Sequence, residues 1–193
     1  MDLTPQLVMV RHDLDALPDI VLPDGFVIRT YQDGDASGWE QVVSTAFDRP
    51  FDFAETMAGD GVDLSRIGLI WHGDVAVATA SAWERERWDA VLGQGTGYVH
   101  YVATLPGYGG KGLGSAISLW TLHAFVKMGK KRAVLQTDDM RIPAIAVYLK
   151  LGFRPLVIDE NQYARWQSIF AQLNAPQEMI EEMQAQPVLP IQL

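Results

Sequence analysis

The sequence predicts a single domain of the α/β (α+β) class, in which strands and helices share one hydrophobic core. Its 193 residues are 48% hydrophobic and 20% charged, which gives enough apolar material for a packed core and too little charge for a disordered chain. Short apolar stretches of strand composition alternate with longer stretches at helical spacing, and glycine or proline separates them.

Charge and cysteine content exclude several classes of function. Fifteen Lys+Arg residues against 24 Asp+Glu give a formal net charge of −9, which repels phosphate backbones and anionic lipid and weakly favours cationic acceptors. We therefore expect no nucleic-acid or membrane partner. The absence of cysteine excludes disulfides, thiolate zinc sites and a cysteine nucleophile. The four histidines lack ligand spacing, so we predict no metal; they are His12, His72, His100 and His123.

The first residues contain no basic segment followed by an apolar one, and no apolar run reaches the ~18 to 20 residues of a membrane span. These features predict a soluble cytoplasmic protein, which we expect to be a monomer or a homodimer.

In the first half of the chain, residues 1–24 contain three prolines and many acids, which predicts an N-terminal arm with one short strand at 7–11. A strand is expected at 26–31, and residues 33–35 provide capping groups for a helix that Pro50 ends. A short helix at 53–57 follows.

Two further strands, at 67–71 and 75–83, have the turn signal of a hairpin between them at 72–74. In the second strand Ala76, Ala78, Ala80 and Ala82 share one face, which admits either a packed helix or a ligand, and core packing is the commoner use of small residues. The alternating charges at 84–87 indicate a solvated edge or a substrate contact.

The second half begins with a glycine-rich turn and a strand at 98–104. Five glycines fall between 107 and 114, and a helix then extends to about 128, where Gly129 provides a stop. A strand at 133–137, a helix at 143–151 and a strand at 153–158 follow, and helices at 163–173 and 178–183 complete the chain.

A strand that leads through clustered glycines into a helix is suited to binding a phosphate group, because backbone N–H groups and the helix N-terminus face the anion. A nucleotide P-loop needs Ser or Thr after Gly-Lys, whereas Gly112 follows Lys111. The dinucleotide spacing Gly107, Gly109, Gly112 is present, with Asp138 after the next strand, but no βαβ series surrounds it, which disfavours a nicotinamide oxidoreductase. Glycine loses more conformational entropy on folding than any other residue, so five glycines would be an unfavourable choice for a loop that only connects two elements.

Residues 98–153 resemble the acyl-CoA-binding core of the GNAT superfamily of N-acetyltransferases. In that family the loop has the form (Gln/Arg)-x-x-Gly-x-(Gly/Ala), and Gly112 and Gly114 fill its last two positions, with Gly109 in place of Gln or Arg. Residues 144–153 are similar to the family's Ala-x-x-x-Tyr-x-x-x-Gly-Phe, and Arg141 stands where the family usually has Asn.

This resemblance implies a mixed, mostly antiparallel sheet of six to seven strands flanked by helices. It implies an N-terminal arm at 1–24, a GNAT-like acyl-CoA-binding catalytic domain at 25–160 and a C-terminal helical extension at 161–193 packed on the same domain. The expected activity is acetyl transfer from acetyl-CoA to a small-molecule or peptide amine by direct attack, with acceptor specificity in residues 26–95. The alternative is a non-catalytic acyl-CoA sensor or partner-binding module.

The resemblance also implies catalytic roles for His100 and Tyr148. Strand alternation places Tyr98, His100 and Val102 on one face, where a neutral imidazole is suited to accept a proton from the amine. A histidine bonded within the sheet is the alternative, with Glu84 and Glu86 as reserve bases.

Tyr148 matches the family tyrosine that protonates the leaving thiolate, and a core aromatic is the alternative. Two interpretations are equally supported for each of Lys111, Arg141 and Lys150: a contact with a CoA phosphate, or a solvated surface charge. The implied set of acetyl-CoA contacts is Val102, Thr104, Gly109, Gly110, Lys111, Gly112, Leu113, Gly114, Arg141 and Tyr148.

Overall fold

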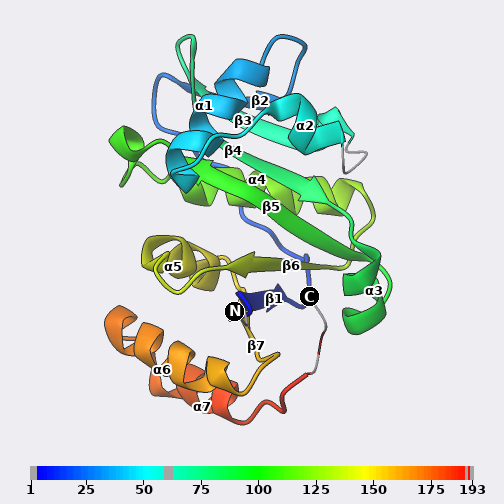
Figure 1. Ribbon diagram of the computed structural model, residues 1–193, viewed down its shortest axis with the longest axis vertical. Coiled ribbons are helices and arrows are strands. Elements are labelled where there is room, and N and C mark those ends of the chain that lie inside the picture. Colours follow the sequence, from blue (N-terminus) through cyan, green and yellow to red (C-terminus); the bar gives the residue numbers. More distant parts are fainter. Residues whose placement is uncertain (1–3, 59–62, 190, 192–193) are drawn as a thin grey trace.

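The computed structural model describes residues 4–58, 63–189 and 191, which form seven strands and seven α-helices (Figure 1). The strands are β1 Leu7–Arg11, β2 Phe26–Thr30, β3 Ile67–His72, β4 Val75–Trp83, β5 Thr96–Thr104, β6 Arg132–Thr137 and β7 Arg154–Leu156. The helices are α1 Ala36–Phe47, α2 Phe53–Ala58, α3 Glu86–Leu92, α4 Leu113–Lys127, α5 Ile142–Lys150, α6 Asn161–Leu173 and α7 Gln177–Gln184.

The strands form one sheet in the order β2-β3-β4-β5-β6-β1-β7. All neighbours are antiparallel except β5 and β6, which are parallel because the crossover through α4 returns the chain in the same direction. The expectation of a mixed, mostly antiparallel sheet of six to seven strands flanked by helices is confirmed.

Strand β1 lies between β6 and β7 and is antiparallel to both. The segment expected to form an N-terminal arm thus contributes an interior strand to the sheet. Its residues 7–9 have no exposed surface, because Leu7 and Met9 pack into the core on one face and Val8 into the core on the other. A continuous apolar run is the pattern of a strand buried on both faces.

Helices cover the sheet on two sides. Residues of α4, α5, α6 and α7 pack with Leu7, Met9 and Leu135 in one hydrophobic cluster, and residues of α1, α2 and α3 pack with Val8 and Val134 in another. The sheet is therefore the middle of three layers, and the described part of the C-terminal extension packs on the same core as the central domain.

The alanine face of β4 is interrupted by a bulge on β4: Ile70 pairs with Ala78 and Trp71 with Ala76, so Val77 is the extra residue. Ala78 and Ala80 pack against α4, as expected for small residues beneath a helix. Ala76, by contrast, lies toward α1, where a Cβ built on Gly38 would come within 3.0 Å of it. A bulge inserts one residue and reverses the alternation beyond it.

The sequence does not predict helix α3, because the alternating charges at 84–87 indicate a solvated strand edge or a substrate contact. It is only seven residues long, too short to show helical periodicity. Tertiary contacts hold it, since Trp88 is fully buried and the Asp89 carboxylate accepts a hydrogen bond from the Thr96 N–H at 2.8 Å.

Candidate active site

Strands β5 and β6 are paired only over the first four residues of each, and a cavity lies where the two strands separate. The register runs from Thr96 opposite Arg132 to Val99 opposite Leu135, and both strands continue beyond it. The cavity has a volume of about 460 Å³. Its lining comes from residues 98–102 of β5, residues 135–138 at the end of β6, Gln6, Phe47, Arg49, Arg141 and Tyr148.

A bulge in β5 shapes this wall. Ser81 is opposite His100 and Thr79 is opposite Ala103, so β5 has one residue more than β4 in this interval. Tyr101 takes up the extra length in a left-handed conformation with φ of 49°, which is uncommon for a residue with a side chain. The sequence-based alternation is therefore wrong beyond His100: Tyr101 packs with His100 toward the α1 layer, and Val102 packs toward α4.

His100 lies among aromatic rings on the cavity wall. Its ring centroid is 4.0 Å from that of Tyr101, 4.5 Å from that of Trp83 and 5.0 Å from that of Tyr98. Burial lowers its pKa to about 3, and the positive charges of Arg85 and Arg87 act in the same direction. The imidazole is consequently neutral at physiological pH, although its affinity for a proton is far below that of an exposed histidine.

Tyr148 lies in the same cavity, on the side formed by α5. Its side chain is 6% exposed and its ring contacts that of Phe153 edge to face, with centroids 5.9 Å apart. Burial raises the pKa of the phenol well above its ordinary value, and the charge of Arg141 opposes this shift only in part. The hydroxyl therefore keeps its proton at neutral pH and can donate it.

The glycine loop connects β5 to α4 and is exposed from Gly109 to Gly112. Gly110 and Gly112 have φ of +76° and +78°, and a Cβ built on either would meet no atom within 4 Å. The first helical hydrogen bond of α4 runs from the Ala116 N–H to the Gly112 carbonyl, so the N–H groups of residues 113–115 have no acceptor within the helix. These features form a cradle that fits an anion such as a pyrophosphate.

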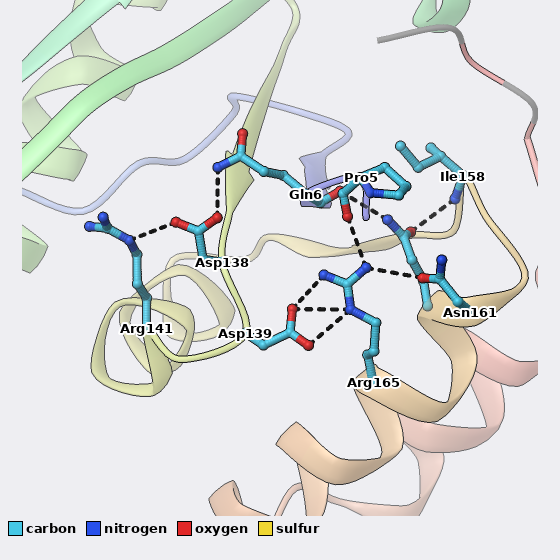
Figure 2. A network of polar contacts seen from close by, with 9 residues as sticks. Pro5, Gln6, Asp138, Asp139, Arg141, Ile158, Asn161 and Arg165 are labelled. Atoms are coloured by element: carbon cyan, nitrogen blue, oxygen red, sulfur yellow. Dashed lines mark hydrogen bonds and ion pairs between the residues drawn. The ribbon is translucent and has the colours of Figure 1, made fainter. Parts of the chain in front are cut away.

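Arg141, which immediately precedes α5, is held by hydrogen bonds and by an aromatic ring. Its Nε donates to Asp138 Oδ2 at 3.0 Å, and Gln6 Nε2 donates to the other oxygen of that carboxylate at 2.9 Å (Figure 2). Its guanidinium carbon lies 4.3 Å from the centroid of the Phe47 ring. Arg141 therefore links the start of β1, the end of β6 and the end of α1.

The next acid, Asp139, belongs to a second group of contacts that ties α6 to the same loop. Its carboxylate accepts hydrogen bonds from Arg165, whose Nη1 also donates to the Pro5 carbonyl at 2.8 Å and to Asn161 Oδ1 at 3.0 Å (Figure 2). The loop that carries Arg141 is thus fixed from both sides.

The reserve bases lie outside the lining of this cavity. Glu84 forms ion pairs with Lys130 and Arg66, and these partners lower the pKa of its carboxyl group. Glu86 begins α3. Both acids are less well placed than His100 to meet an amine in the cavity.

The cavity brings together four of the expected residues, namely His100, Val102, Arg141 and Tyr148. The glycine loop, Thr104 and Lys111 lie outside its lining, and the Leu113 side chain is buried beneath α4, which leaves its backbone N–H for a ligand. Lys150 ends α5 outside the cavity.

Several contributors to the cavity were not identified from the sequence, because their segments are brought together only by folding; among them are Gln6, Phe47, Arg49, Tyr101 and Gln136. Motif spacing contains no signal for them. In the sequence, Phe47 and Arg49 are recognisable only as an aromatic and a charged residue near the end of an expected helix.

Within the described ranges, no three His, Asp or Glu side chains are grouped so as to hold a metal ion. None of the helices in the described part of the chain combines the length and hydrophobicity that crossing a membrane requires.

Comparison with known proteins identifies relatives of this sequence. The sequence is 32% identical over 161 residues to a mycothiol acetyltransferase from Thermomonospora curvata, covering 79% of this chain and 53% of the relative. A second mycothiol acetyltransferase, from Catenulispora acidiphila, is 30% identical, with coverage of 76% and 49%. The chain therefore spans about half the length of these curated relatives.

Solved structures share the fold. A GCN5-related N-acetyltransferase from Sphaerobacter thermophilus matches with a TM-score of 0.62 at 21% identity, covering 79% of this chain and 49% of that one. The yncA protein from Salmonella typhimurium, solved with its cofactor acetyl-CoA, matches with a TM-score of 0.56 at 19% identity and coverage of 67% and 79%. Residues 30–153 match the family described as the acetyltransferase (GNAT) family, and the chain belongs to that family.

Proposed function

We propose that the chain transfers an acetyl group from acetyl-CoA to the amine of a small molecule by direct attack. The observation that carries this proposal is the cavity between the parted strands β5 and β6, where a neutral His100 and a protonated Tyr148 line one space. Membership of the GNAT family supports it, as do the relatives named mycothiol acetyltransferase, whose name points to a small-molecule acceptor.

In the proposed reaction the ammonium of the acceptor first loses a proton to solvent. The free amine nitrogen then attacks the carbonyl carbon of the thioester, a C–N bond forms, and the C–S bond breaks with its electron pair on sulfur. His100, neutral at physiological pH, accepts a hydrogen bond from the amine and orients its lone pair. Tyr148 donates a proton to the departing thiolate and regains one from the attacking nitrogen through solvent.

The proposed coenzyme site is the glycine loop and the adjoining end of β5. The N–H groups at the start of α4 would bind the pyrophosphate, with Gly110, Gly112 and Gly114 leaving the backbone accessible and Lys111 adding positive charge. The thioester end would extend past Thr104 and Val102 into the cavity. Gly109 contributes only backbone, since it has no side chain to replace the Gln or Arg of the family loop.

The low pKa of His100 favours one second candidate, an acyl-CoA-binding module without turnover. A single experiment distinguishes the two. Purified protein is titrated with acetyl-CoA by calorimetry and then assayed for thiol release with a panel of small amines. Binding with amine-dependent thiol release supports the transferase, binding without release from any amine supports the module, and an absence of binding contradicts both.

A further inference from the structure

We propose that the acceptor is a small amine that also carries a carboxylate, which Arg141 and Arg49 bind on the cavity wall. This inference rests on the function proposed above and names the substrate class of the same site.

The first observation is the way in which Arg141 is held. Asp138 engages only its Nε, and the Phe47 ring supports the plane of the guanidinium. No described residue accepts a hydrogen bond from its two Nη groups, and in Figure 2 they point away from Asp138. A guanidinium fixed in this manner presents a planar edge that matches the two oxygens of a carboxylate.

The second observation concerns Arg49, which lines the same cavity as Arg141. Arg49 stacks over Phe51 with its guanidinium carbon 4.3 Å from the ring centroid, and the Phe47 and Phe51 rings are 5.7 Å apart. Within the described residues Arg49 forms no ion pair with a carboxylate. Two cations supported by rings in the lining of one cavity give a positive region that an anion would neutralise.

The local charge of the cavity opposes that of the whole chain. The charged lining residues are Arg49, Arg141 and Asp138, and both oxygens of Asp138 already accept hydrogen bonds. Arg85 and Arg87 add positive potential at His100. In a protein of net charge −9, a cationic cavity selects for an anionic group even though the overall charge favours cationic acceptors.

The position of this region favours the acceptor over the coenzyme. Phe47 and Phe51 belong to the layer formed by α1 and α2, whereas the glycine loop leads into α4 in the opposite layer. An anion on Arg49 and Arg141 thus approaches from the α1 side. The aromatic rings around His100 lie in the same cavity and can receive the amine, and a volume of about 460 Å³ limits the acceptor to a small molecule.

The test uses matched amines with acetyl-CoA and measures kcat/KM from thiol release. Amino acids are compared with their amides, which differ only in the carboxylate, and phosphoethanolamine is compared with ethanolamine. We expect the wild type to prefer the carboxylate by at least tenfold, although the amide has the lower amine pKa and more free base. Arg141→Gln should bring this ratio close to one, mainly through KM, with acetyl-CoA affinity unchanged. Arg49→Gln should act in the same direction more weakly.

Lys111→Gln is the matched control, because it removes a cation at the glycine loop and should leave the preference intact. If Arg141→Gln does not fold, Arg141→Lys keeps the charge, loses the planar fork and should still reduce the ratio. Equal use of acids and amides, or a preference confined to phosphoethanolamine, would overturn the carboxylate assignment. Weakened acetyl-CoA binding in Arg141→Gln with an unchanged ratio would assign the residue to a CoA phosphate. Thiol release from no amine would instead refute the proposed transferase, and this inference with it.

Discussion

Replacing Gly114 by alanine should make the protein more stable and leave its coenzyme binding nearly unchanged, whereas replacing it by valine should weaken coenzyme binding. Gly114 is the second residue of α4, and a Cβ built there meets nothing closer than Thr104 Oγ1 at 3.9 Å. Glycine in a helix costs about 0.5–1 kcal/mol relative to alanine, so the melting temperature should rise by about 1–4 °C for a chain of this length.

The family loop admits Gly or Ala at this position, so one methyl group is compatible with an anion at the start of α4, whereas the branched side chain of Gly114→Val would crowd it. We expect acetyl-CoA affinity to fall at least about tenfold in Gly114→Val, or about 1.4 kcal/mol, and to change little in Gly114→Ala. Calorimetric titration measures the affinity, and scanning calorimetry of the same preparation measures the stability. A folded Gly114→Val protein with wild-type affinity would refute the assignment of the loop.

Gly112→Ala provides the comparison, because it should weaken binding and also destabilise the fold. Its φ of +78° is strained for alanine by about 1 kcal/mol. Gly34 has φ of +98° with nothing within 4 Å and lies in the turn before α1. Gly34→Ala therefore controls for backbone strain and should leave acetyl-CoA affinity unchanged.

Further predictions concern the cavity and the core. Tyr148→Phe should lower turnover by about tenfold or more with little change in affinity; normal turnover with a lowered melting point would show that Tyr148 only packs. His100→Ala removes the hydrogen-bond acceptor that orients the amine and should lower kcat by about tenfold, the scale of one hydrogen bond. Because the pKa of His100 is about 3, the acid limb of kcat/KM in the wild type should follow the pKa of the amine used, and a limb fixed near 6.5 for every amine would contradict the low value. The same pKa lies below that of an unfolded histidine, so the unfolded chain takes up a proton first as the pH falls below about 6.5. Stability should then decrease toward pH 3 by up to about 1.4 kcal/mol per pH unit, and denaturant titrations should show a shallower decrease in His100→Gln. Gly97→Ala would bring a Cβ within 2.4 Å of Phe125 and should cost about 1–3 kcal/mol, seen as a lower denaturation midpoint.

Most elements could be predicted from the sequence, because their signals are local. The β3–β4 hairpin is indicated by its turn residues, and α4 by the glycines before it and Gly129 after it. Gly112, Gly114 and Tyr148, to which we propose chemical roles, stand out in the sequence because they match motifs of the family.

Other features depend on partners distant in the sequence. Strand β1 reads as a short apolar segment in a proline-rich arm, and only its pairing with β6 and β7 shows that it lies inside the sheet. Helix α3 is held by Trp88 in the core and by Asp89 bonded to Thr96, not by helical periodicity.

The sequence by itself determined the class of the fold, the glycine cradle at the start of α4 and the tyrosine of α5, because these depend on the order and spacing of neighbouring residues. The tertiary structure alone decided the bulge at Tyr101, the low pKa of His100 and the pair Arg49 and Arg141 beside one cavity. Burial and electrostatic potential arise from groups that folding brings together, and the parting of β5 from β6 is what brings them to a single space.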